Sequence, residues 1–377
     1  MLSTTGIIFA NIHDNNISEL TSKRTIASVP YACRYRFIDF TLSNMVNSGI
    51  NNIDIITQAN YHSLMDHLGS GKDWDLARRE GGLKILPPFI APGSTNTGIA
   101  NTRLEALKNI AGVISSIKDE YVVLSDCDVI CNVDIREMIE THEKSGSDLT
   151  VAVKKVNLTK EEAKKNVIMT SNENGRIVDV SMYPNDFEGE ADISLNMIVM
   201  KASYLRQCVS EAISHGYTSL SKDIIIRNMG QKNFNVYKFD GYFAVITSME
   251  DYFKCSMDLI TKQQVGESLF VQKSRPIYTK VRNLAPTYYE PSSSIKDSML
   301  ADGCIIEGTV ENSILFRGVK VAKGAVVRNS ILMQDTVVLE NASLNCVITD
   351  KNVVIREGRN LSGAETQPFY VEKGKMI

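Results

Sequence analysis

Thr5-Gly6-Ile7-Ile8-Phe9-Ala10 is an apolar run near the start of the chain, and it predicts a buried strand. It leads directly into the loop Asn11-Ile12-His13-Asp14-Asn15-Asn16-Ile17. A strand and loop that open a domain in this way commonly form a phosphate site, and such a site needs glycines so that backbone N–H groups can approach the phosphate. This loop contains no glycine, arginine or lysine. The sequence therefore predicts the scaffold of a phosphate-binding domain without its usual cradle.

Short apolar runs alternate with amphipathic segments over the first two-thirds of the chain. The predicted strands cover residues 53–57, 121–125 and 149–153, and the predicted helices cover residues 100–117 and 135–145. Strand–helix alternation of this kind is typical of an α/β, Rossmann-like domain with a mainly parallel sheet. Ligands of such sheets bind beyond the carboxyl ends of the strands, so the loops after Ala10, Ser125 and Ser181 are expected to face the site.

The pattern changes after a predicted helix over residues 248–264 and a linker marked by Pro276, Pro286 and Pro291. Two apolar registers then repeat every six residues, namely Val319, Ala325, Ile331 and Val337, and Leu315, Val321, Val327, Met333 and Leu339. This period predicts a left-handed parallel β-helix. We therefore divide the chain into a first domain over residues 1–247, a helix and linker over 248–290, and a β-helix domain over 291–377.

Composition limits the kinds of partner. The 377 residues are too many for one compact core, which favours two domains. A formal net charge of −3 gives no reason to expect a nucleic-acid partner. No apolar run approaches the length that spans a bilayer, so no membrane partner and a cytoplasmic location are expected. The seven cysteines include no C-x-x-C pair, and we interpret them as reduced thiols.

The segment from Tyr35 to Ile50, which includes Arg36-Phe37-Ile38-Asp39-Phe40, resembles the sugar-nucleotide pyrophosphorylases. It is most similar to bacterial ADP-glucose pyrophosphorylase, and especially to the glycogen-biosynthesis paralogue that accompanies a catalytic subunit. The first loop of active members reads G-G-x-G-[ST]-R-L. Those positions fall on Asn11 to Ile17 here, and none of the signature glycines or the arginine is present.

The metal positions of that family also differ in this chain. Active members hold Mg²⁺ with two aspartates, the first in a motif like L-[AS]-G-D-H and the second in one like G-Y-W-x-D-V-G-T. The matching position of the first motif is Cys127, flanked by Asp126 and Asp128, either of which could reach a metal from the side. The matching position of the second is Val245, which offers no oxygen ligand. The resemblance therefore implies no resident metal and no catalytic residue.

Other family motifs are kept only in part. Tyr183 stands at the sugar-phosphate lysine of a V-E-K-P motif, and Lys23 and Arg24 match the start of a K-R-A-K-P-A stretch. The resemblance implies a degenerate substrate-like pocket formed by Asn11, His13, Lys23, Arg24, Gly98, Asn101, Asp126, Asp128, Tyr183, Asn196, Lys222 and Asp223. Several of these residues also have a purely structural interpretation: a turn at Gly98, a helix-start ion pair at Lys222 and Asp223, and, as the favoured interpretation there, a solvent-facing imidazole at His13.

Regulation in this family uses basic residues between the two domains, one of them just before the R-x-I-D-F segment. Arg34 stands at that position, with Arg36 beside it, so the resemblance implies an effector site at these residues. An arginine can bind a phosphate through two parallel hydrogen bonds. A solvated surface charge is the alternative interpretation of Arg34.

The first functional hypothesis is a regulatory or helper subunit of ADP-glucose pyrophosphorylase. It would form a homo-oligomer alone and a hetero-tetramer with a catalytic paralogue. No cofactor is expected for the chain alone, Mg²⁺ is expected in the catalytic partner, and a nucleotide, a sugar phosphate or a phosphorylated effector is the expected ligand. The alternatives are a weakly active glucose-1-phosphate adenylyltransferase and a sugar-nucleotide sensor that acts on another protein. A β-helix acyltransferase is set aside, because all five histidines precede the β-helix and such enzymes commonly use a histidine base there.

Overall fold

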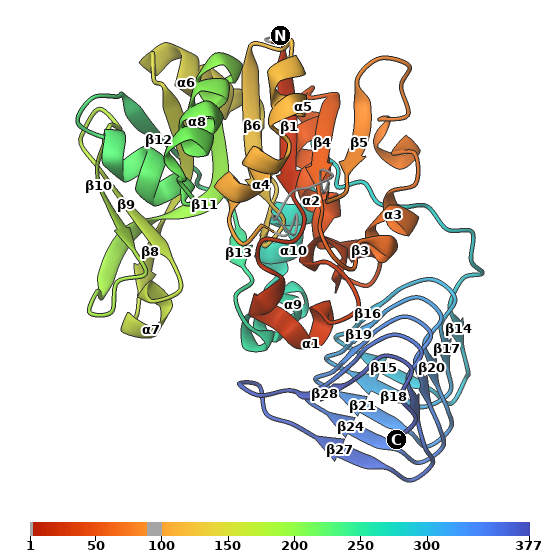
Figure 1. Cartoon of the computed structure of the whole chain (residues 1–377). Coiled ribbons are helices and arrows are strands. Elements are labelled where there is room, and N and C mark those ends of the chain that lie inside the picture. The colour runs from red at the N-terminus through yellow and green to blue at the C-terminus, as the bar shows by residue number, and fades with distance from the viewer. Residues whose placement is uncertain (1–2, 89–99) are drawn as a thin grey trace.

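The computed structural model describes residues 3–88 and 100–377, and it has two lobes (Figure 1). A sheet with helices on both faces forms the first lobe, and a coiled stack of short strands forms the second. The predicted order of an α/β domain followed by a parallel β-helix is confirmed. No helix of the described residues is long and apolar enough to cross a membrane.

The first lobe is built on a sheet of nine strands among the described residues. They are β1 (Thr4–Phe9), β4 (Asn52–Ile56), β5 (Gly82–Leu86), β6 (Tyr121–Asp126), β8 (Leu149–Leu158), β9 (Val167–Ser171), β10 (Ile177–Met182), β11 (Gly189–Lys201) and β12 (Phe234–Lys238). Strands β5, β4, β1 and β6 run parallel in that order; β4, β1 and β6 are largely buried, and β5 is the partly exposed edge strand. Each of the three strands predicted at residues 53–57, 121–125 and 149–153 is present.

The sheet is mixed rather than mainly parallel. Strand β11 runs antiparallel to β6, β8 and β9, and β10 runs antiparallel to β9. Neighbouring parallel strands need a crossover of a dozen or more residues, whereas antiparallel strands can be joined by a tight turn. The segment from β8 to β11 has no helix long enough for such crossovers, so it folds as an antiparallel extension of the sheet (Figure 1).

Helices cover both faces of this sheet. The α-helices of the first lobe, of which α1 and α7 lie away from the sheet faces (Figure 1), are α1 (Ser18–Thr21), α2 (Phe37–Asn47), α3 (His62–Leu68), α4 (Arg103–Asn109), α5 (Ala111–Ser116), α6 (Ile135–Ser145), α7 (Lys160–Ala163), α8 (Ala202–His215), α9 (Met249–Thr261) and α10 (Gln263–Phe270). Two short strand pairs, β2 (Pro30–Tyr31) with β3 (Tyr35–Arg36) and β7 (Val129–Cys131) with β13 (Phe243–Val245), flank the sheet.

One of the three predicted helices has the expected bounds, and two are interrupted. The helix predicted over residues 248–264 ends at Thr261 and is followed, after Lys262, by α10. Helix α6 has the predicted bounds, and α9 begins after Ser248, whose hydroxyl accepts a hydrogen bond from the Asp251 amide. The single helix expected over residues 100–117 is instead α4 and α5, separated at Ile110. Gly112, which has a low helix propensity, lies two residues beyond the break.

The second lobe is a parallel β-helix with three five-stranded faces among the described residues. The first face holds β14 (Tyr288–Tyr289), β17 (Ile305–Ile306), β20 (Lys320–Val321), β23 (Val337–Val338) and β26 (Val354–Ile355). The second holds β15 (Ser294–Lys296), β18 (Thr309–Glu311), β21 (Val326–Arg328), β24 (Ser343–Asn345) and β27 (Asn360–Ser362). The third holds β16 (Met299–Leu300), β19 (Ile314–Leu315), β22 (Ile331–Leu332), β25 (Val347–Thr349) and β28 (Phe369–Val371). Since β14 pairs with β17, the β-helix begins at Tyr288 rather than at residue 291.

A strict six-residue register would give 18 residues per coil, but stacked strands of the β-helix lie 15, 17 or 22 positions apart, as Ile305 and Lys320, Val321 and Val338, and Val347 and Phe369 show. Val321 pairs with Val338, which is 17 positions later, so one turn of this coil contains five residues instead of six. Val338 is fully buried in consequence, while Leu339, which the six-residue register placed inward, is 38% exposed. The apolar period thus identified the architecture but misplaced the inward position after this shortened turn.

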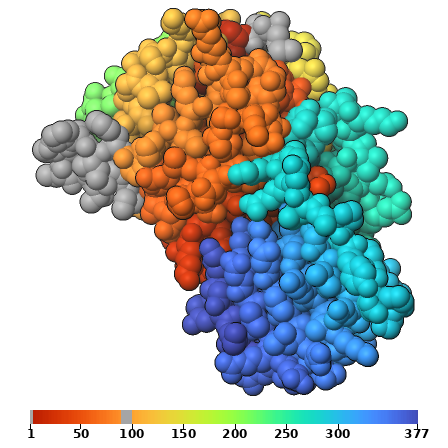
Figure 2. All heavy atoms as spheres, turned by 90° about the vertical axis from the view of Figure 1, so that its right-hand side faces the viewer, coloured from red at the N-terminus to blue at the C-terminus, as the bar shows by residue number. Residues whose placement is uncertain are grey.

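A buried ion pair joins the two lobes. Arg24, in the first lobe, donates from Nη2 to both carboxylate oxygens of Asp350 in the β-helix, at 2.6 and 2.9 Å. Tyr370 of the β-helix adds hydrogen bonds to the Glu19 carbonyl at 2.9 Å and to Asp350 at 3.1 Å. The space-filling view shows the β-helix packed directly against the first lobe, with the linker running over their boundary (Figure 2).

Candidate functional site

The first loop keeps its shape through polar side chains instead of glycines. No residue from 11 to 17, all of which the structure describes, has a backbone φ in the left-handed region. The Asn11 side-chain oxygen accepts from the Thr57 hydroxyl and the Gln58 amide, both at 2.8 Å, and the Asp14 carboxylate accepts from the Ile26 amide at 2.7 Å. The loop therefore needs no positive φ, and the absence of glycine is explained locally.

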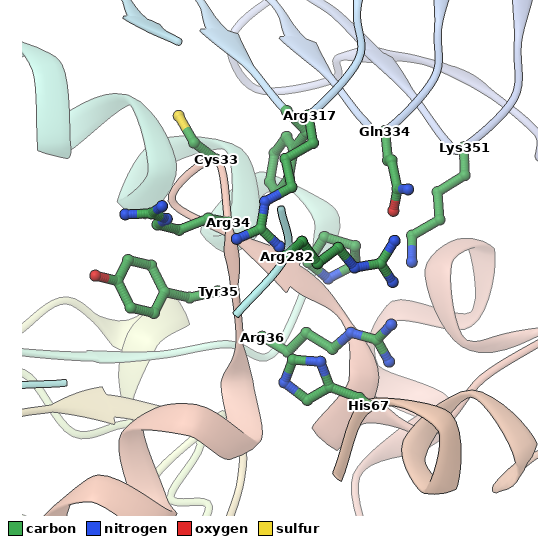
Figure 3. A pocket seen from close by; sticks show the side chains of 11 residues that line it. Cys33, Arg34, Tyr35, Arg36, His67, Arg282, Arg317, Gln334 and Lys351 are labelled. Atoms are coloured by element: carbon green, nitrogen blue, oxygen red, sulfur yellow. The ribbon is translucent and has the colours of Figure 1, made fainter. Parts of the chain in front are cut away.

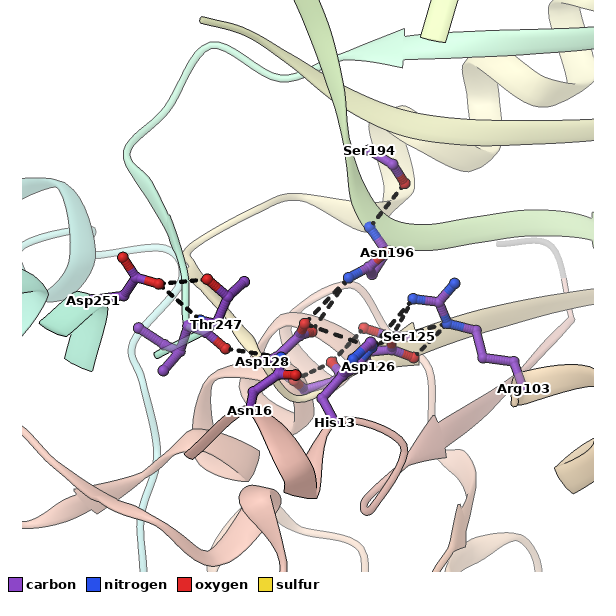
Figure 4. Close-up of polar contacts among 12 residues, drawn as sticks. His13, Asn16, Arg103, Ser125, Asp126, Asp128, Ser194, Asn196, Thr247 and Asp251 are labelled. Carbon is purple, nitrogen blue, oxygen red and sulfur yellow. Dashed lines mark hydrogen bonds and ion pairs between the residues drawn. The ribbon is translucent and has the colours of Figure 1, made fainter. Parts of the chain in front are cut away.

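A cluster of three titratable side chains lies where β1 and β6 end (Figure 4). His13 extends from the loop after β1, and its Nε2 lies 2.6 Å from Asp126 and 3.6 Å from Asp128. Asn196, on β11, places its side-chain nitrogen 3.3 Å from the Asp128 carboxylate. Both carboxylates are buried, and the His13 side chain is 22% exposed. The expectation that the loops after Ala10 and Ser125 meet at one edge is confirmed.

Burial and neighbouring charges shift the pKa values of all three side chains in this cluster. Burial alone would lower the pKa of His13, but the carboxylates of Asp128 and Asp126 outweigh it and raise that pKa above its usual value. Burial disfavours an ionised Asp126 as well, yet the Arg103 guanidinium and His13 lower the pKa of Asp126 to about 2. The pKa of Asp128 is raised by burial and by the neighbouring charge of Asp126. Asp126 is therefore held as the anion of the cluster.

Arg103 is the residue that the sequence interpretation missed. It is the first residue of α4, and its Nε lies 2.9 Å from each oxygen of Asp126, while Nη2 also hydrogen-bonds to Asp126. Nη2 lies 3.5 Å from His13 Nε2. The only sequence signal was a charged residue two positions after Asn101, and nothing in the spacing linked it to β6.

An open cleft begins at this cluster. It is lined mainly by polar side chains: His13, Asn16, Arg103, Asp128, Lys164, Lys165, Asn166, Val167, Tyr183, Ser194, Asn196, Ser221, Val245 and Thr247. Tyr183 and Asn196 line one cleft with His13 and Asp128. Lys164 and Lys165, which follow α7, bring positive charge that the sequence interpretation did not include.

The two positions that the family resemblance assigns to metal ligands do not fit Mg²⁺. Cys127 is 1% exposed and packs in the hydrophobic core, and burial raises the pKa of its thiol. Val245 pairs with Val129 in the β13–β7 ribbon, which brings an apolar side chain to the cleft wall near Asp128. Mg²⁺ requires hard oxygen ligands in octahedral geometry, and neither position provides one.

The remaining predicted pocket residues lie elsewhere. Arg24 does not line the cleft, because Asp350 holds it at the domain boundary. The side chains of Lys23, Asn101 and Lys222 are exposed and outside the cleft lining. The Asp223 carboxylate accepts from the backbone amides of Thr218 and Ser219. Gly98 is outside the described residues.

A second pocket lies between the two lobes and is strongly basic (Figure 3). Its basic lining residues are Arg34, Arg36, His67, Arg282, Arg317 and Lys351. Arg34 lies 3.6 Å from Asp302 of the β-helix and is half-exposed, whereas Arg36 is buried and donates to the Ser63 carbonyl at 2.6 Å. Burial and then the charges of Arg36 and Arg24 lower the pKa of Lys351 to about 7. Both arginines predicted as effector ligands thus line one pocket.

Comparison with known proteins agrees with both lobes. The family model described as nucleotidyl transferase matches residues 13–262, and the one described as GlmU-like, C-terminal hexapeptide matches residues 286–367. The glycogen biosynthesis protein GlgD of Geobacillus stearothermophilus is 38% identical over 371 residues, which cover 98% of this chain and 96% of that protein. GlgD of Bacillus subtilis is 31% identical, covering 98% and 95% of the two chains. Glucose-1-phosphate adenylyltransferase of Acetivibrio thermocellus is 32% identical, covering 98% and 87%.

Proposed function

This chain belongs to the nucleotidyl transferase family, in the group of glycogen biosynthesis proteins and glucose-1-phosphate adenylyltransferases, and we propose that it is a helper subunit of ADP-glucose pyrophosphorylase. The reaction of that enzyme joins ATP and glucose 1-phosphate to give ADP-glucose and diphosphate. A role in glycogen biosynthesis follows from the family, and the helper role is our inference from the cleft.

The observation that carries this proposal is the apolar side chain of Val245 in the cleft wall. Nucleotidyl transfer depends on positioning and on cations that stabilise the charge developing on the phosphates. The family resemblance places a metal ligand at Val245, and the nearby β7 backbone fixes that side chain beside Asp128. The absence of arginine and lysine from the 11–17 loop supports the same proposal.

We propose that the basic pocket between the lobes binds a phosphorylated effector. Five arginine and lysine side chains converge there, and only Asp302 lies within ion-pair distance of Arg34 and Arg317 among the described residues. Guanidinium groups bind phosphate oxygens through paired hydrogen bonds. Because residues of both lobes line this pocket, an anion bound there would favour one arrangement of the lobes over another.

Assembly provides the direct test. The purified chain, its catalytic paralogue and their mixture are sized by light scattering and assayed with ATP, glucose 1-phosphate and Mg²⁺. We expect a homo-oligomer with a turnover well below about one per second for the chain alone, against about ten per second for a typical enzyme. We expect a hetero-tetramer with a higher turnover or tighter substrate binding than the catalytic paralogue has alone.

Two outcomes contradict this proposal. A turnover above about one per second for the chain alone favours a weakly active adenylyltransferase, whose carboxylates would be Asp126 and Asp128. Separate elution of the two proteins, with unchanged kinetics of the paralogue, favours a sensor that acts on a different protein.

A further inference from the structure

The Arg103 guanidinium sits inside a side-chain set that has the composition of a metal site. The ligand atoms of His13, Asp126 and Asp128 all lie within 4.8 Å of one another. Imidazole nitrogen and carboxylate oxygens suit first-row divalent cations. Arg103 reaches this set from α4 and contacts two of its three members, Asp126 and His13.

The buried charges of this cluster require a cation. The side chains of Asp126 and Asp128 are 0% and 2% exposed, and a buried carboxylate is strongly destabilising unless a positive group or several hydrogen bonds accompany it. Asp128 receives a hydrogen bond from Asn196 at 3.3 Å, and Asp126 receives its contacts from Arg103 and His13. His13 also lies 3.6 Å from Asp128, but the shorter contacts, at 2.6 Å from His13 and 2.9 Å from Arg103, are made to Asp126, so the charge compensation is greater there.

We propose that Arg103 is the resident cation of this site and that its guanidinium takes the place of a divalent metal ion. Nε of Arg103 lies 2.9 Å from both oxygens of Asp126, so a metal ion at this carboxylate would be repelled by the guanidinium charge. An arginine is permanently charged and needs no ion from solution. This inference deepens the proposed loss of catalysis, but it concerns the cluster alone and does not depend on the helper role.

The guanidinium also changes what the cleft presents to a ligand. Arg103 lines the cleft together with His13 and Asp128, and its side chain is 17% exposed. The cleft therefore presents a covalently attached positive group, whose N–H donors point in fixed directions, to a ligand. A bound metal ion would instead offer coordination positions that ligand atoms could occupy in place of water. Substituting Arg103 should uncover a latent metal site made of His13, Asp126 and Asp128.

The test is Mn²⁺ binding, measured from the electron paramagnetic resonance signal of the free ion. The samples are the whole chain, Arg103→Met and the double variant Arg103→Met/Asp128→Asn. We expect Arg103→Met to bind one Mn²⁺ at least about tenfold more tightly than the natural chain, which corresponds to about 1.4 kcal/mol. We expect the double variant to lose that gain. Mn²⁺ should also raise the thermal midpoint of Arg103→Met but not that of the natural chain.

Arg206→Met is the matched control, since Arg206 donates to the Ile117 carbonyl, and neither residue lines the cleft. Its Mn²⁺ affinity should equal that of the natural chain. Folded Arg103→Met without a gain in affinity overturns the proposal. If Arg103→Met does not fold, the natural chain decides: tight Mn²⁺ binding that Asp128→Asn abolishes contradicts the proposal, and its absence supports it. None of these readouts requires catalysis or a partner, so the helper role can fail separately.

Discussion

Arg24 and Asp350 are 326 positions apart in the sequence, and they form a buried ion pair with two hydrogen bonds of 2.6 and 2.9 Å from one guanidinium nitrogen. The pair connects the loop after α1 to the turn between β25 and β26 of the β-helix. Both side chains are less than 5% exposed. Its main consequence is mechanical, because it links the two lobes that together line the basic pocket.

Breaking this pair should destabilise the boundary between the lobes. Arg24→Met leaves the Asp350 carboxylate buried without its cation, and removing one partner of a buried pair costs about 3–5 kcal/mol. The expected result is a clear fall in the thermal midpoint, measured by scanning calorimetry. The double variant Arg24→Met/Asp350→Leu should recover much of the loss, since no buried charge remains. Equal midpoints for Arg24→Met and the natural chain would show that the pair is not a structural link.

A lysine at Tyr183 should strengthen binding of glucose 1-phosphate. The Tyr183 side chain is half-exposed and lines the cleft, but a phenol brings no positive charge to a phosphate. A charge-assisted hydrogen bond contributes about 1.5–3 kcal/mol, so Tyr183→Lys should bind the sugar phosphate at least about tenfold more tightly by isothermal titration calorimetry. Tyr183→Gln, of similar length without the charge, is the control. No difference between the two variants would mean that the cleft does not take a sugar phosphate at this position.

Removing Arg34 should weaken anion binding in the basic pocket. With inorganic phosphate as the probe, Arg34→Ala is expected to lower the affinity about three- to tenfold. The effect is limited to this range because the Arg34 side chain is half-exposed, and water screens its attraction to a bound anion. Arg356→Ala removes an exposed arginine that does not line this pocket and should have no effect. If the affinity and the effector response of the mixed assembly are the same for Arg34→Ala and the natural chain, the effector role of this residue is wrong.

Anion binding in the same pocket should weaken as the pH rises. Lys351 faces Arg36, Arg24, Asp350 and Lys373, and burial followed by the two arginine charges lowers its pKa to about 7. It is therefore mostly charged below pH 7 and mostly neutral above, so the affinity for sulfate, which is a dianion throughout this range, should fall about three- to tenfold between about pH 6 and 8. Lys351→Met should flatten this profile and bind weakly throughout. The same shift has the opposite effect on folding: free-energy linkage makes the Lys351 contribution to stability rise with pH from about 7 toward the ordinary lysine value of 10.5.

The shortened β-helix turn predicts unequal effects at neighbouring positions. Val338 is fully buried, so Val338→Ala should lower the free energy of unfolding by about 1.5–3 kcal/mol. Leu339 is 38% exposed, and Leu339→Ala should change it by less than about 0.5 kcal/mol. Urea unfolding of the two variants provides the comparison. A larger loss of unfolding free energy for Leu339→Ala than for Val338→Ala would contradict the shortened turn and support an uninterrupted six-residue register.

Local chemistry determined much of this protein from the sequence alone. Apolar runs between amphipathic segments identified the strands at residues 53–57, 121–125 and 149–153, because the side-chain pattern of a buried strand is a property of a few neighbouring residues. The six-residue period identified the β-helix for the same reason. The missing glycines at residues 11–17 and the apolar Val245 are likewise visible without a structure.

Only the tertiary structure decided which distant charges meet. Arg103 reaches Asp126, and Arg24 reaches Asp350, because the sheet order and the docking of the lobes bring these residues together. The sequence interpretation placed Arg24 in the cleft and did not include Arg103. Charged side chains are long, and their partners are set by the packing of other elements rather than by spacing along the chain. The sequence pattern also failed to predict that Val338 points inward. One shortened turn shifts by one position which of the later residues in the coil face the core.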